Sequence, residues 1–348
     1  MIRLRRACAL LLSLLLLSAM PAGAEQPQTL SLPAKLAKTP DRLYAAIDEH
    51  PGVTAINLVS ATVDPEVLNV LSVRYPAITF TYQLSVFGKK ASWDAQRVNL
   101  YPTKMTTEKQ FRQLCANLRY LPNVTELTAL QTTFTFDQLE TLTSIRPGMH
   151  ISCNLKIGKH SPRNTLTAFG TRHSYHSTRY TSDDMRALKY MDHLLALDVG
   201  HNGITDLSFL TDLPQLRVLI LADNQITDLS PIAQLHSLEY LEIFKNPVTD
   251  LTPLAELRSL IDLNMTFCSV SDFSPLLALS KLDRLWVSKN PISSEQLAAL
   301  QQALPNCTIN TTAGEIAPTA EGWRQKHPRY LQIVHMFTTG SYEAFRGI

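Results

Sequence analysis

Residues 216–237 read LRVLILADNQITDLSPIAQLHS, and residues 238–259 read LEYLEIFKNPVTDLTPLAELRS. Both lines have leucine in columns one and four, an aliphatic residue in column six, asparagine in column nine and isoleucine or valine in column eleven. The pattern recurs every 22 residues from Leu194 to Ile309, with Cys307 replacing a leucine and Cys268 replacing an asparagine. A fixed period of this length is the sequence signature of a stacked repeat.

The aliphatic columns explain how such repeats stack. Columns four and six are two residues apart, so both side chains point to the same face of a short strand. One strand cannot bury that face, whereas a stack of parallel strands closes a continuous core behind it. Asparagine in column nine can bond backbone groups of a buried turn that would otherwise lack partners. We expect Cys268 to have the same structural role.

The second half of each line predicts one short helical turn. Asp228, Asp250 and Asp272 in column thirteen are each followed by Leu or Phe, then Ser or Thr, then Pro. A Ser or Thr before Pro is typical of the N-cap and first position of a helix. The fifth line departs from this form, because Ser293 and Gln296 have the spacing of a capping box. Leucines follow at helical intervals, so we expect a true α-helix there.

The pattern L-x-x-L-x-L-x-x-N-x-I resembles the leucine-rich repeat family. The D-L-S-P half-line is similar to the family's 22-residue bacterial, internalin-like subclass. This resemblance implies an α/β fold, a right-handed solenoid with a parallel β-sheet on the concave face and short helices or 3₁₀ turns on the convex face. It also implies recognition of proteins, peptides or glycans on the concave face.

The start of the chain has the features of a secretory signal peptide. Residues 1–24 combine three arginines, an apolar run at 11–17 and small residues ending at Ala24. We therefore predict cleavage after Ala24 and a secreted, extracellular protein, or a periplasmic one in a Gram-negative source. Loss of these three arginines, with no acidic residue, takes the formal charge from +2 to −1. The charge therefore gives no argument for nucleic acid, and no later apolar run of about 18 residues predicts membrane insertion after processing.

Residues 25–39 are rich in Pro, Gln and small residues, and we predict a linker. Residues 40–190 contain two modules of about 70 residues, in which PGVTAI at 51–56 recurs as PNVTEL at 122–127. Capped helices are expected at 107–114 and 181–188. We interpret the modules as long, atypical leucine-rich repeats on the same solenoid. The alternative is a separate small α/β domain packed on its N-terminal end.

Residues 191–310 hold the regular repeats, and residues 311–348 fall outside the pattern. A helix is expected from Arg329 to Phe337. Terminal repeats need a cover over their exposed core. Aromatic and aliphatic residues of the tail could supply it: Trp323, Tyr330, Leu331, Val334 and Phe337. The alternative is that this tail docks a partner.

Columns three, five, seven and eight of the repeat point away from the predicted core. Stacking does not require aromatic residues there, and strands about 4.8 Å apart would gather them into one patch. Aromatic residues beside charged ones are typical of binding hot spots. The predicted partner-binding residues are Tyr240, Glu242, Phe244, Lys245, Phe267, Arg284 and Trp286. The alternative is that the C-terminal tail folds over them.

No motif indicates catalysis or a cofactor. The sequence lacks a Ser or Cys in a glycine elbow, a glycine-rich phosphate loop and an H-E-x-x-H helix. His160, His173 and His176 lie in a Ser/Thr/His/Tyr-rich insertion. A His-x-x-His pair on a loop is weak evidence for a metal, so we predict no metal site.

Four cysteines follow the predicted signal peptide: Cys115, Cys153, Cys268 and Cys307. We expect them to be small buried thiols. A disulfide between Cys115 and Cys153 is the alternative in an exported protein.

These features predict an exported leucine-rich-repeat protein that binds a protein, peptide or glycan on its concave face. It would use no cofactor, bind no nucleic acid and catalyse no reaction. Two alternatives remain open. One is a structural or assembly protein that self-associates, and the other is an enzyme with a site in the N-terminal modules or the His-rich insertion.

Overall fold

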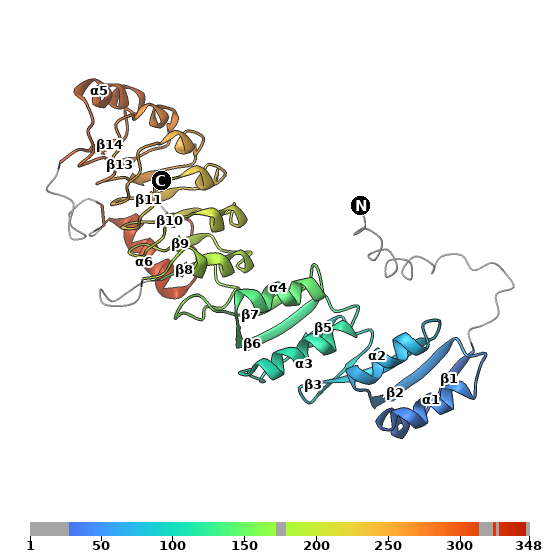
Figure 1. The fold of residues 1–348 in the computed structure, drawn as a ribbon. Helices are drawn as coiled ribbons and strands as arrows, with labels where there is room; N and C mark the ends of the chain where they lie inside the picture. Colours follow the sequence, from blue (N-terminus) through green and yellow to red (C-terminus); the bar gives the residue numbers. More distant parts are fainter. Residues whose placement is uncertain (1–27, 172–178, 313–322, 325–326, 346–348) are drawn as a thin grey trace. The chain divides into compact units, whose positions relative to one another are not determined.

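The computed structural model describes residues 28–171, 179–312, 323–324 and 327–345. The predicted signal peptide and two histidines of the insertion, His173 and His176, lie outside these residues. The described strands form sheets of four, three and seven strands (Figure 1). The chain divides into two compact units, Met1–Ala95 with Ala116–Asn123 and Gln96–Cys115 with Val124–Ile348.

The regular repeats form the seven-stranded parallel sheet, with one short strand per line. Its order is β14-β13-β12-β11-β10-β9-β8. The strands are β8 (Ala168–Gly170), β9 (Ala196–Asp198), β10 (Val218–Ile220), β11 (Tyr240–Glu242), β12 (Asp262–Asn264), β13 (Arg284–Trp286) and β14 (Thr308–Asn310). Equivalent columns pair directly, as Val218 does with Tyr240. The predicted fold class is confirmed.

The leucine columns build the core behind this sheet. Leu197, Leu219, Leu241, Leu263 and Leu285 of column four are fully buried. Each buried leucine side chain stabilises the fold by about 1.5–3 kcal/mol relative to exposure. The core therefore gains one equivalent layer with every added repeat.

The asparagine column bonds the turns between repeats, as predicted. Asn224 Nδ2 donates to the carbonyl of Val199 at 3.0 Å, and its Oδ1 accepts from the N–H of Ile204 at 3.1 Å. Cys268 stands in the same column, and its Sγ donates to the carbonyl of Ile243 at 3.4 Å. The thiol thus replaces one of the amide's bonds and is structural.

Short 3₁₀ turns return the chain on the other side of the core. They are η3 (Ser208–Asp212), η4 (Ser230–Ile232), η5 (Thr252–Leu254) and η6 (Ser274–Ala278). The prediction of Ser or Thr as N-cap is wrong, because Ser230, Thr252 and Ser274 are the first residues of their turns, and a Leu or Phe stands at the N-cap position. Instead Asp228 Oδ1 accepts from the N–H of Ser230 at 2.8 Å, and the other lines repeat this bond. An ionised carboxylate is a stronger acceptor than a hydroxyl.

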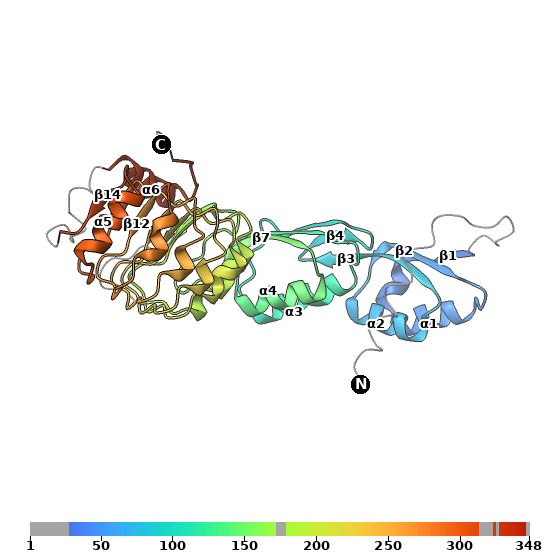
Figure 2. The ribbon, with the colours of Figure 1, turned by 90° about the horizontal axis from the view of Figure 1, so that it is seen from above.

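The fifth line does form an α-helix, α5 (Ser294–Ala303), with the predicted capping box between Ser293 and Gln296. The predicted C-terminal helix is α6 (Pro328–Thr339). In Figure 2, α6 and the short helical turns lie on opposite sides of the repeats.

The two N-terminal modules have matching elements. The first holds β1 (Thr29–Ser31), η1 (Ala34–Lys38), α1 (Pro40–Asp48), β2 (Ala55–Thr62), α2 (Pro65–Arg74), β3 (Thr79–Val86) and β4 (Lys89–Ser92). The second holds β5 (Arg97–Asn99), α3 (Glu108–Arg119), β6 (Glu126–Phe134), α4 (Phe136–Ile145) and β7 (His150–Leu155). In both modules a strand pairs in parallel with the strand that begins 24 residues later, as Ala55 with Thr79 and Glu126 with His150.

These modules pair their strands in the orders β1-β2-β3-β4 and β5-β6-β7, separate from the seven-stranded sheet. Their interpretation as atypical leucine-rich repeats stays a prediction. The linker predicted for residues 25–39 is wrong over its described part. Leu30 pairs with Ile56 in the sheet, and Ala37 on η1 is buried.

One further expectation is corrected, and the expectation of buried free thiols is confirmed for Cys115 and Cys153. The helix expected at 181–188 is the 3₁₀ helix η2 (Asp183–Tyr190) rather than an α-helix. Among the described residues no disulfide joins Cys115 to Cys153, which lie on α3 and β7. Burial raises the pKa of the Cys153 thiol to about 12, so it stays protonated. No helix in the described part of the chain is long and apolar enough to cross a membrane.

Candidate binding face

The residues predicted to bind a partner fall into two groups. Tyr240 and Glu242 on β11, and Arg284 and Trp286 on β13, are buried, with exposed fractions from 0% to 5%. The prediction that these four are exposed is wrong. The other three are in the turns after β11 and β12: Phe244 is half-buried, Lys245 is exposed and Phe267 is 42% exposed.

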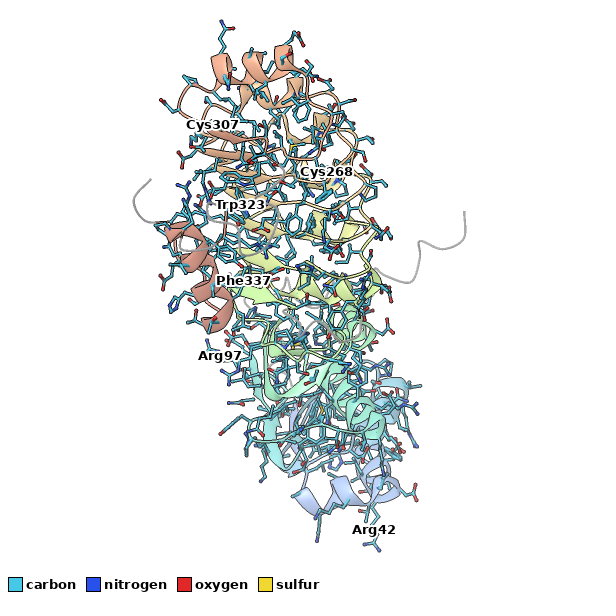
Figure 3. All side chains as sticks on the ribbon, turned by 90° about the vertical axis from the view of Figure 1, so that its left-hand side faces the viewer. Arg42, Arg97, Cys268, Cys307, Trp323 and Phe337 are labelled. Atoms are coloured by element: carbon cyan, nitrogen blue, oxygen red, sulfur yellow. The ribbon has the colours of Figure 1, made fainter. Side chains whose placement is uncertain are left out.

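The cover over the first group is the C-terminal tail, meaning described residues 323–324 and 327–345. It lies on the concave face, which consists of the strand side chains that point away from the leucine core. Figure 3 shows Trp323 and Phe337 of the tail over the strands of this sheet. Parallel sheets are normally covered on both faces, and the tail supplies the second layer. The predicted alternative, in which the tail folds over the aromatic residues, therefore describes this structure.

Trp323 inserts between two aromatic residues of the face. Its ring centroid lies 5.4 Å from that of Tyr240 and 5.1 Å from that of Trp286. The indole N–H donates to Glu242 Oε1 at 2.9 Å. The guanidinium of Arg284 lies 4.5 Å from the Trp323 ring centroid. Aromatic pairs contribute about 0.5–1.5 kcal/mol beyond their buried area, so this cluster anchors the tail.

Two buried carboxylates of the face pair with arginines of the tail. Asp262 accepts two hydrogen bonds from Arg329, from Nε and from Nη2, both at 2.9 Å. Arg284 also donates to Asp262, through Nε at 3.0 Å. Glu242 pairs with Arg324, and its side chain is fully buried. A buried charge that loses its partner costs about 3–5 kcal/mol. Each arginine therefore stabilises the docked position of the tail on the concave face.

The two surfaces carry charges of opposite sign. The strand side chains of columns three and five carry three carboxylates, Asp198, Glu242 and Asp262, and one guanidinium, Arg284. Arg324 of the tail pairs with Glu242, and Arg329 pairs with Asp262 and with Asp283.

Burial governs the protonation of this face. It raises the pKa of Asp198, and the nearby Glu242 carboxylate adds to the rise. The N–H of Gly200 opposes the rise by donating to Asp198 Oδ1 at 3.0 Å. Burial alone would lower the pKa of Arg324, but the facing Glu242 carboxylate raises it, so the guanidinium stays charged.

Small residues make room for α6 over β8 and β9. Ala168 and Ala196 are buried beneath the helix, whose Ile333 and Met336 belong to the same apolar cluster. A Cβ at Gly170 would lie 3.4 Å from Cδ1 of Phe337. Alanine and glycine in these columns therefore let the helix approach closely.

The end of the tail bonds the backbone beside β8. Gly340 ends α6 in a left-handed conformation with φ 71°, which glycine adopts without strain. Its carbonyl accepts from the N–H groups of Thr167 and Ala168, both at 3.2 Å. The N–H of Tyr342 donates to Thr167 Oγ1 at 2.7 Å. Burial raises the pKa of Tyr342 to about 12.

A second surface stays exposed along the turns that follow the strands. We call Lys245, Phe267 and Lys289 the turn ridge, because they occupy column eight of three successive repeats. All three have positive φ, between 54° and 60°. Successive turns are bonded to each other, since the N–H of Phe267 donates to the carbonyl of Ser288 at 3.0 Å. The ridge thus presents one aromatic side chain between two exposed lysines.

Two other features bear on catalysis and metal binding. His160 packs against Phe169 and Tyr180, and burial lowers its pKa. A hollow of about 450 Å³ is lined by residues of α4, η2 and η3, among them Phe136 and Arg186, whose guanidinium lies 4.0 Å from that ring. Across the described ranges, no group of three or more His, Cys, Asp or Glu side chains could hold a metal ion.

Sequence reasoning missed Arg324, Arg329, Ile333 and Met336 as residues of this face. A usable signal was present, because residues 218–221 read VLIL without alternation, which indicates a strand buried on both sides. A second signal was the presence of acidic residues in columns three and five together with arginines in the tail, which indicates that the two segments can pair. Repeat periodicity alone could not reveal the cover, since the tail has no repeat.

Comparison with known proteins agrees with the geometry of the repeats. A family model described as leucine-rich repeats, two copies, matches residues 214–256, and a single leucine-rich repeat model matches residues 191–207. The chain contains leucine-rich repeats over these residues. A search of curated protein sequences finds no match.

Solved structures similar to this chain include two internalins of Listeria monocytogenes. Internalin C2 is 25% identical, with 65% of this chain and 86% of that chain covered and a TM-score of 0.35. Internalin F is 19% identical, with 79% and 87% covered and a TM-score of 0.38. A leucine-rich-repeat protein of Leptospira interrogans is 20% identical, with 81% and 75% covered and a TM-score of 0.37.

Proposed function

We propose that this leucine-rich-repeat protein is exported and binds a protein partner through the turn ridge, without catalysing a reaction. Leucine-rich repeats generally serve as protein-interaction modules, because stacking gives an extended surface with regularly spaced side chains. The single observation that carries the proposal is Phe267, a large aromatic residue held exposed between Lys245 and Lys289.

The side chain of Phe267, rather than its backbone conformation, supports a role in binding. Column eight has positive φ in every regular repeat, at His201, Asp223, Lys245, Phe267 and Lys289, so the left-handed turn belongs to the repeat. A large aromatic ring is not needed to make that turn. The ring is 42% exposed, and contact with a partner would remove this apolar surface from water.

The flanking lysines favour an acidic partner. Lys245 and Lys289 are exposed on either side of the ring, and exposed aromatic residues beside cations are typical of interface hot spots. An acidic protein segment with an apolar side chain would place that side chain on Phe267 and its carboxylates near the two ammonium groups.

The test is a capture experiment with the full chain from Glu25 onward and culture medium or surface extracts. One variant carries Lys245→Ala, Phe267→Ala and Lys289→Ala. The matched control carries Leu277→Ala and Lys281→Ala, which remove an exposed apolar and an exposed basic side chain elsewhere. We expect a partner that the wild type and the control hold and the ridge variant loses by at least tenfold in affinity. Equal capture by all three proteins would contradict the proposal.

Export is proposed from residues 1–24 alone. Cell fractionation of the intact chain, with amino-terminal sequencing, should find a mature form that begins at Glu25 outside the cytoplasm. An unprocessed chain in the cytoplasm would contradict this part.

A further inference from the structure

The concave face is already a filled binding groove. Its occupant, the tail, contributes an indole, two guanidinium groups and the apolar side of a helix. Each has a matched partner: Trp323 lies between Tyr240 and Trp286, and the arginines meet buried carboxylates. The chemistry that this groove recognises can therefore be read from the tail.

The docked tail does not share the leucine core. That core lies behind the sheet, in columns one, four and six, on the side opposite the strand side chains that the tail covers. Isolated helices shorter than about 12–15 residues are marginal in water, and α6 has 12 residues and no side-chain cap bond at its N-terminus. Leu331 on its outer side is 56% exposed. The tail is therefore folded by docking and can leave as one unit.

The ion pairs contribute less free energy to docking of the tail than their number suggests. The desolvation cost of buried charges can offset most of their attraction. An empty groove would still be unfavourable, because Glu242 and Asp262 would lose Arg324 and Arg329 while Tyr240 would be uncovered. A groove that is filled by another tail of the same chemistry is therefore lower in free energy than an empty groove.

A second copy of the chain carries such a tail. We infer that the concave face is a binding groove for a segment in which a tryptophan and an arginine precede an arginine-bearing helix, filled in cis by residues 323–324 and 327–345 and filled in trans by the same segment of a second copy. Ten residues, 313–322, link Thr312 to Trp323, and an extended chain of this length reaches roughly 35–40 Å. Reciprocal exchange of a terminal element is a low-cost route to a symmetric dimer.

The first arm of the test uses a labelled synthetic peptide of residues 323–345 and full-length proteins. In the variant with Arg324→Glu and Arg329→Glu, the cis tail cannot pair with Glu242 and Asp262, but the groove is unchanged. Fluorescence anisotropy should show at least tenfold tighter peptide binding to this variant than to the wild type, where the linked tail competes at high effective concentration.

The control variant, Arg97→Glu with Arg112→Glu, makes the same charge change at exposed ion pairs and should bind the peptide no better than the wild type. If the charge-reversal variant does not fold, Arg324→Lys with Arg329→Lys keeps the charges but loses the two-pronged guanidinium contact. It should bind the peptide at an intermediate level. A folded variant of either kind that does not bind the peptide overturns the inference.

The second arm measures mass by light scattering over a range of concentrations, for the wild-type chain and for the charge-reversal variant. A dimer that the wild type forms as its concentration rises, and that the charge-reversal variant does not form, supports reciprocal exchange between copies. Peptide binding by the variant without a wild-type dimer overturns the second copy as the occupant. The turn-ridge variant should bind its own tail unchanged, which separates this inference from the proposed function.

Discussion

At the scale of single residues, the buried pair between Asp262 and Arg329 decides whether the concave face stays covered. Asp262 sits in the third column of its repeat, with a side chain 1% exposed. Its negative charge is tolerated because Arg284 and Arg329 both donate to it. A column that elsewhere holds Ala196 and Val218 accepts a carboxylate here because the neighbouring strand and the tail each bring a guanidinium.

Replacing Arg329 with Met should destabilise the covered state by about 3 kcal/mol, because Asp262 loses two hydrogen bonds while it stays buried. Urea unfolding followed by tryptophan fluorescence measures this, since Trp286 and Trp323 report on docking. Arg112→Met at an exposed helical pair serves as the control and should cost no more than about 0.5 kcal/mol. Equal effects of the two substitutions would show that the buried pair contributes little.

The elements that the sequence predicted best are those decided by local chemistry. The 22-residue strands, the capping box of α5 and the helix α6 follow from spacing and from residues in contact along the chain. The strand β1 was missed because its pairing with Ala55 joins residues 26 positions apart. The binding face was predicted only in part for the same reason. Periodicity shows which side chains leave the core, but a distant tail decides which of them meet water.

The 3₁₀ turns predict a pH dependence at the scale of one element. Hydrogen bonds from the hydroxyl and N–H of Ser230 lower the pKa of the exposed Asp228, and Thr252 and Ser274 do the same for Asp250 and Asp272. A carboxylate whose folded pKa is depressed stabilises the fold above its ordinary value, near 3.8. That stability is lost as the pH falls through the lowered folded value.

The triple variant Asp228→Asn, Asp250→Asn and Asp272→Asn should therefore have a lower Tm than the wild type at neutral pH. The difference should shrink as the pH falls below about 4, and it should vanish below the lowered folded pKa, where both proteins are uncharged at these positions. Thermal unfolding by circular dichroism from pH 2.5 to 7 checks this. A difference that grows toward low pH would contradict the assignment.

At the scale of the whole molecule, the repeats have two surfaces, of which one is covered and the other is exposed to water. The concave face is covered by the chain's own tail, through Trp323, Arg324 and Arg329. The turn ridge remains in water, with Phe267 at its centre. Partner binding is therefore proposed for the ridge, while exchange of the tail is proposed for the face.

The measurement that tests this division most directly is hydroxyl-radical footprinting of the full chain from Glu25 onward, read by mass spectrometry. It compares three reactive aromatic side chains within the same sheet region. We expect rapid oxidation of Phe267 and strong protection of Tyr240 and Trp286. Oxidation of Tyr240 and Trp286 at rates comparable with that of Phe267 would contradict it, because the tail would then not cover the concave face.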